Sequence, residues 1–120
     1  MSNALPQMEP PPEHEGERRG EQRRRVFLSG RVIHSSGELT VDCTISDIST
    51  AGARLRFANV EPLGDPLYLI NLSHGLAFKA QVIWRLDNKV GLAFNEYFDL
   101  SAPTEETPKF LRRHWLEHVR

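Results

Sequence analysis

Hydrophobic and polar side chains alternate with a period of two along much of the chain after residue 25. The clearest stretch is 39–46, where the apolar positions are Leu39, Val41, Cys43 and Ile45 and the polar ones are Thr40, Asp42, Thr44 and Ser46. A period of two sends successive side chains to opposite faces of a strand. We therefore predict a strand with one face in a core, and we expect Cys43 on that face to be a buried apolar side chain without a catalytic role.

Five more segments have the composition of short strands and are separated by turn residues. They cover residues 26–34, 53–57, 67–72, 76–85 and 90–94. In the segment 76–85 the apolar set includes Trp84, so core packing is favoured for its indole over a contact with a ligand. Six short strands at this spacing predict an all-β fold, either a small barrel or a sandwich.

The hydrophobic period changes near the end of the chain. Thr107 suits a helix cap, Pro108 suits a first helical position, and apolar residues then recur at Leu111, Trp115 and Val119. A spacing of four residues places them on one face of an amphipathic helix of about three turns. We expect residues 101–120 to form a linker and this helix, which packs on the strands or on a partner.

The first 17 residues are rich in proline and glutamate and contain few large apolar side chains. Such a segment buries too little surface to offset the entropy of ordering it, so we expect a disordered tail. Neither a signal peptide nor a run of about 20 apolar residues is apparent. With Cys43 as its single cysteine, the chain is expected to be cytoplasmic, without a disulfide and without membrane insertion.

Positive charge is concentrated in one place although the formal net charge is −1. Five of the eight residues from 18 to 25 are arginine, so an attraction for anions would come from this cluster and not from the overall field. Arg19 and Arg23 are four residues apart and can point to one side. A guanidinium binds phosphate oxygens or the O6 and N7 edge of guanine, and it stacks on a base.

A small polar turn, 47–52, lies between two predicted strands. Asp47 offers a carboxylate, Ser49 a hydroxyl and Gly52 a place where backbone can approach closely. Each cluster taken alone has a plainer explanation, because arginine runs are often solvated linkers and Asp, Ser and Gly are common in loops. Antiparallel pairing of the first two strands would bring both clusters to the same end of the fold.

These residues resemble the PilZ domain family, whose members bind the bacterial second messenger cyclic di-GMP. The pattern Arg-x3-Arg before a strand is similar to the first motif of the family, with Arg19 and Arg23 in its two positions. The pattern Asp-x-Ser-x-x-Gly, from Asp47 to Gly52, matches the second motif. The resemblance covers about residues 17–98 and implies a small six-stranded antiparallel β-barrel over residues 18–100, followed by a C-terminal α-helix.

The resemblance also implies a role for each site residue. Arg19 and Arg23 would hold guanine edges and phosphates, with Arg24 as an auxiliary. Asp47 would accept hydrogen bonds from the N1–H and N2–H₂ groups of a guanine. The remaining members of the turn would support it: Ser49 would donate to a phosphate or tie the turn, and Gly52 would permit backbone contact. Ligand binding would order the arginine segment against the barrel, and this change would signal to an effector protein.

Other functions are less well supported by the residues. The histidines are scattered and His114 and His118 lack a third nearby ligand, so no metal site and no cofactor are expected. No nucleophile, base and orienting group are spaced for catalysis, so we do not expect an enzyme. Two alternatives remain open: a PilZ-like interaction domain that does not bind nucleotide, and a small RNA-binding barrel. The net negative charge disfavours the second, so no nucleic acid polymer is expected as a partner.

Overall fold

The computed structural model describes residues 24–34, 39–64 and 66–119. Within this part of the chain, six strands and one helix follow one another in sequence. Their bounds are β1 Arg24–His34, β2 Thr40–Ile48, β3 Gly52–Arg56, β4 Leu67–Asn71, β5 Leu76–Leu86, β6 Lys89–Asp99 and α2 Lys109–Val119.

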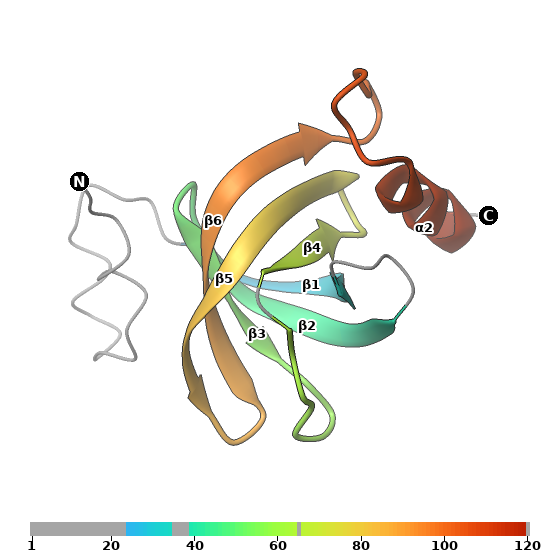
Figure 1. Ribbon diagram of the computed structural model, residues 1–120. Helices are drawn as coiled ribbons and strands as arrows, with labels where there is room; N and C mark the ends of the chain where they lie inside the picture. The colour runs from blue at the N-terminus through green and yellow to red at the C-terminus, as the bar shows by residue number, and fades with distance from the viewer. Residues whose placement is uncertain (1–23, 35–38, 65, 120) are drawn as a thin grey trace.

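The strands close into a barrel with the order β1-β2-β3-β6-β5-β4 (Figure 1). Every neighbouring pair is antiparallel. A two-residue turn joins β5 to β6, and its first residue, Asp87, adopts a φ of 55°. The prediction of an all-β, six-stranded antiparallel barrel with a C-terminal helix is confirmed.

The barrel interior is filled by the apolar faces that the alternating pattern predicts. Its fully buried members come from all six strands and from the residue after β3; they include Val32, Ile45, Leu55, Phe57, Leu69, Ala80 and Leu92. Cys43 packs against this cluster as a partly buried side chain, in agreement with its predicted place on the inward face of β2.

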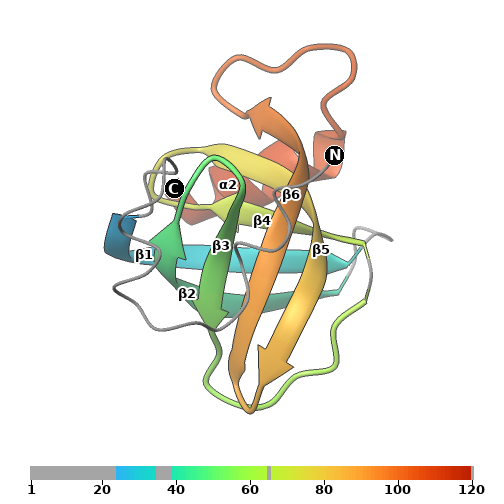
Figure 2. The same ribbon diagram turned by 90° about the vertical axis from the view of Figure 1, so that its left-hand side faces the viewer.

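A second apolar cluster lies between the outside of the barrel and α2. Leu111 of the helix is fully buried there with Ile33, Ile70 and Leu100. Trp115 packs against the same cluster, donates its indole N–H to the carbonyl oxygen of Leu72 at 3.2 Å and covers the face of Gly75. The helix therefore covers the outside of the barrel beside β4, and the turn between β2 and β3 lies on the side away from it (Figures 1 and 2).

Three predicted positions differ from the structure. Leu39 precedes β2 and its side chain is 65% exposed, and Val119 at the end of α2 is 54% exposed, so neither belongs to a core. Trp84 does not enter the barrel either. The register of β5 against β6 shifts between Val82 and Trp84, and the extra residue turns Trp84 to the outer face. There its indole covers Gly91, whose neighbours Val90 and Leu92 are fully buried inside.

Candidate functional site

Asp47 occupies the end of β2 and faces the outside of the barrel. By simple alternation from Ile45 it would face inward, but β2 contains an extra residue at Ser46 relative to β3, which reverses the direction. Asp47 is 8% exposed and pairs in register with Arg54 of β3. Arg54 Nε lies 3.8 Å from Asp47 Oδ2, so the carboxylate is held beside a cation in a largely buried environment.

Asp47 belongs to a row of residues that crosses the barrel from strand to strand. The register pairs Arg25 with Asp47, Asp47 with Arg54, Arg54 with Gly91, and Gly91 with Trp84. The row therefore combines two guanidinium groups, one carboxylate and one indole on the outer face of β1, β2, β3, β6 and β5. Figure 2 shows the side of the barrel formed by β3, β6 and β5.

The turn after Asp47 is closed by its own hydrogen bonds. Ser49 Oγ accepts from the backbone N–H groups of Ala51 at 3.1 Å and Gly52 at 3.3 Å, and the Ser49 N–H donates to the Gly52 carbonyl oxygen at 2.9 Å. The Ala51 carbonyl oxygen also accepts from Phe94 N–H at 2.8 Å, which ties the turn to β6. Both lone pairs of Ser49 Oγ are thus used within the turn, while its O–H remains available as a donor.

The predicted arginines are placed only in part. Arg19 and Arg23 lie outside the described residues, as does the predicted tail 1–17. Arg24 is the first residue of β1 and pairs in register with Ile48. The next residue, Arg25, pairs with Asp47 and is exposed. The arginine cluster therefore leads directly into the strand beside the Asp47 turn.

Sequence reasoning did not include three residues that the strand register brings into one row with Asp47: Arg25, Arg54 and Trp84. A signal existed for Arg54, because it alternates with the core residues Ala53 and Leu55 and must face outward directly opposite the end of β2. For Trp84 the alternation pointed inward, and only the register shift reveals its position. Its buried Nε1 has no hydrogen-bond partner within the described part of the chain, so an indole donor remains unused beside Arg54 and Gly91.

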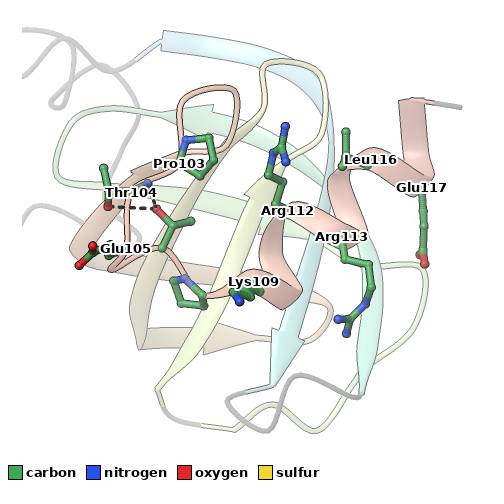
Figure 3. A pocket seen from close by; sticks show the side chains of 10 residues that line it. Pro103, Thr104, Glu105, Lys109, Arg112, Arg113, Leu116 and Glu117 are labelled. Carbon is green, nitrogen blue, oxygen red and sulfur yellow. Dashed lines mark hydrogen bonds between the residues drawn. The ribbon is translucent and has the colours of Figure 1, made fainter.

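The hollows on the described surface include one beside the Asp47 turn and one along α2. One, of about 660 Å³, has an apolar, aromatic lining contributed by residues 48–50, 76, 78 and 94–97; we call it the aromatic hollow. The other, of about 600 Å³, lies along α2 between the loop around Pro103 and the side chains of Lys109, Arg112 and Arg113 (Figure 3). Of these two, only the aromatic hollow includes a predicted site residue, Ser49, which places it next to the Asp47 turn.

Two observations concern metal binding and thiol reactivity in the described residues. The described residues contain no group of three His, Cys, Asp or Glu side chains suited to hold a metal ion. Burial, and secondarily the nearby Asp42 carboxylate, raise the pKa of the Cys43 thiol to about 12, which keeps it protonated and poorly nucleophilic at neutral pH. None of the helices in the described ranges is long and apolar enough to cross a membrane.

The chain was compared with curated proteins and with solved structures. No curated protein matches the chain. Among solved structures, the PilZ domain of CeSA from a cellulose-synthesizing bacterium has 12% sequence identity and a TM-score of 0.45, over 82% of this chain and 98% of that one. YcgR from Escherichia coli, solved in complex with c-di-GMP, has 15% identity and a TM-score of 0.45, over 85% of this chain and 44% of that one.

The family comparison is made on the sequence itself. The PilZ domain family matches residues 17–104, a range that contains the arginine cluster, the Asp47 turn and all six strands. By this match over most of its length, the chain belongs to the PilZ domain family.

Proposed function

We propose that this chain is a cyclic di-GMP receptor that binds its ligand on the outer face of the barrel around the Asp47 turn and acts as an adaptor, not as an enzyme. The observation that carries the proposal is the register of Arg25, Asp47 and Arg54 on three neighbouring strands. A carboxylate between two guanidinium groups suits a ligand that has guanine N–H donors close to phosphate oxygens.

The two halves of the proposed site differ in how they are built. Asp47, Ser49 and Gly52 belong to the barrel and to a turn closed by hydrogen bonds, so they are in place before a ligand arrives. Arg19 and Arg23 belong to the segment that leads into β1 at Arg24. Ligand phosphates would draw these guanidinium groups toward the turn, and the ordering of that segment would be the signal read by an effector protein.

The charge balance near the turn favours an anion despite the presence of Asp47. Within the row, Arg25 and Arg54 outnumber the single carboxylate. The carboxylate serves a separate purpose, because it accepts from the N1–H and N2–H₂ groups of guanine and these donors are absent from adenine at the same positions. We expect the indole of Trp84, in the same row, to add a stacking surface for a base.

Calorimetric titration of the full chain with cyclic di-GMP, GMP and a short RNA tests this function. We expect saturable binding of cyclic di-GMP, much weaker binding of GMP and no specific binding of RNA. Well-folded protein that fails to bind cyclic di-GMP would refute the proposal and favour a PilZ domain that acts through protein contacts alone. Preferential binding of RNA would instead favour the nucleic-acid alternative.

A further inference from the structure

The aromatic hollow is continuous with the Asp47 turn but has a different chemistry. Its walls include Phe78 and Phe94, whose rings stack with centroids 3.9 Å apart and planes 9° apart, and Tyr97, whose ring lies 5.9 Å from that of Phe78. Tyr97 is 59% exposed although it belongs to this cluster. Ile48, Leu76 and Phe94 also pack against the barrel core, so the hollow opens onto the apolar end of the barrel.

The hollow exists because the end of β6 and the start of β5 extend beyond β3. β3 pairs with residues 89–93 of β6, whereas residues 94–99 of β6 pair only with β5 among the described strands. The end of β6 runs past the turn between β2 and β3 (Figure 2). Aromatic side chains on the overhang therefore face a space that no described strand fills.

The first strand, β1, begins at the edge of this space. Arg24, the first residue of β1, pairs with Ile48, and Ile48 lines the hollow. Twenty-three residues precede Arg24, and residues 5–12 have the sequence Leu-Pro-Gln-Met-Glu-Pro-Pro-Pro. Proline-rich segments bind to aromatic-lined grooves at a small entropic cost, and methionine sulfur makes favourable contacts with aromatic rings.

We propose that the segment 5–12 of this chain docks in the aromatic hollow of its own barrel. Residues 13–23 span at most about 40 Å when extended. The described part of the chain has principal extents of 37, 30 and 25 Å, so the connection is long enough. The tether gives an effective concentration of the order of millimolar, so a weak contact suffices for substantial occupancy.

Docking would hold the arginine segment at both ends, between the docked residues 5–12 and the start of β1. Arg19 and Arg23 would then remain within reach of the Asp47 turn, and the ligand would still be needed to order them against it. This consequence rests on the proposed function, whereas the docking itself does not.

Paramagnetic relaxation enhancement on the full chain tests the docking without any ligand. A nitroxide is attached at Ser2→Cys, outside the docking segment; Cys43 is spared because its thiol is partly buried and has a raised pKa. We expect loss of amide signal intensity concentrated at residues 48–50, 76–78 and 94–97. Intensity loss that is absent, spread evenly, or concentrated along α2 would overturn the proposal.

Variants separate docking from chance proximity. Leu5→Ser combined with Met8→Ser changes only the tail, and Tyr97→Ser changes an exposed wall of the hollow; each should restore the lost signals. Leu86→Ser is the matched control. Leu86 is 58% exposed, nearly the same as Tyr97 at 59%, but it lies at the end of β5, whereas the hollow is lined by Leu76 and Phe78 at the start of β5. Restoration by the control, or persistence in both test variants, would contradict docking in this hollow.

A mixture of nitroxide-labelled protein with isotope-labelled, nitroxide-free protein identifies the occupant. We expect no intensity loss in the mixture, because the docking is intramolecular. Loss at the hollow in the mixture would show that a second copy fills it and would overturn the proposal. Because these measurements contain no nucleotide, their failure is distinct from a failure to bind cyclic di-GMP in the titration.

Discussion

Arg54 and Asp47 lie opposite each other on β3 and β2, with Arg54 Nε 3.8 Å from Asp47 Oδ2 and side-chain exposures of 14% and 12%. At this distance the attraction is mainly electrostatic. The register also places Arg25 on the other side of Asp47. The carboxylate is therefore flanked by cations on both neighbouring strands.

Asp47→Asn should weaken binding of cyclic di-GMP by at least about tenfold, equivalent to about 1.4 kcal/mol. The amide keeps the shape of the side chain, but it loses the charge and replaces one acceptor by a donor that faces the guanine N–H groups. Calorimetric titration measures the change. The matched control is Asp42→Asn on the same strand, since Asp42 is an exposed carboxylate bound to Arg31 at 2.8 Å. The affinity of this control variant for cyclic di-GMP should be unchanged. Equal effects of the two substitutions on the affinity for cyclic di-GMP would show that Asp47 is not part of the site.

Arg19→Ala and Arg23→Ala should each weaken binding of cyclic di-GMP by at least about tenfold. Arg19→Lys and Arg23→Lys should recover only part of the loss, because an ammonium group supplies charge without the planar fork that binds phosphate or guanine bidentately. Arg31→Ala serves as the control, since this arginine on β1 is engaged by Asp42. Unchanged affinity in both alanine variants would show that the arginine motif is placed wrongly.

Gly91→Ala should displace the indole of Trp84 and destabilise the fold by about 1–3 kcal/mol, as overpacking does. An added Cβ at Gly91 would overlap Nε1 and Cε2 of Trp84. Denaturant unfolding measures the free energy, and the NMR signal of the Trp84 indole N–H reports the displacement. Gly64→Ala is the comparison, because its Cβ would lie 3.3 Å from the side-chain Nδ1 of His34 and needs only a small adjustment. If the Trp84 signal stays in place, the indole does not rest on Gly91.

Trp84→Ala separates a stacking role from a structural one. If the indole stacks on a base of the ligand, the substitution should weaken binding by about 1–3 kcal/mol while the barrel remains folded. Trp115→Ala is the contrasting variant: this indole packs against the α2 cluster and bonds to Leu72, so its loss should lower stability and leave affinity unchanged in protein that is still folded. An affinity unaffected by Trp84→Ala would exclude Trp84 from the site.

The alternating pattern predicted the strands well because half of each strand faces an apolar interior. It placed Trp84 wrongly, and it gave no direction for Asp47, which follows the regular stretch 39–46; the cause is the same at both positions. An extra residue at Ser46 in β2 and another at Ile83 in β5 interrupt the period of two. Asp47 and Trp84 would face inward by alternation, and the bulges turn both of them to the outer face.

Bulges depend on pairing between distant strands, so a local pattern does not reveal them. The Asp47 turn was nevertheless found, because its Asp, Ser and Gly positions follow a motif with fixed spacing. Arg54 and Trp84 follow no such motif. Their membership in the row depends on the registers of β3, β6 and β5, which only the fold determines.

The stability of the protein should fall more steeply above pH 9 than that of Cys43→Ala. Burial raises the pKa of the Cys43 thiol from 9.0 to about 12 in the folded state. Between these values the unfolded chain releases the thiol proton while the folded chain retains it, so the folded state binds more protons and the free energy of unfolding decreases as pH rises. Below pH 9 both states are protonated and the two curves should run parallel.

Denaturant unfolding of both proteins from pH 7 to about pH 11 measures this difference, because the other titrating groups are shared. The wild type should lose up to about 1.4 kcal/mol per pH unit relative to Cys43→Ala above pH 9. Reaction with a thiol reagent provides a second measure: Cys43 should react slowly in the folded protein and rapidly once denaturant unfolds it, since thiolate is the reactive form. Parallel stability curves over the whole range, together with rapid labelling of the folded protein, would mean that the thiol is accessible to solvent and does not pack against the barrel core.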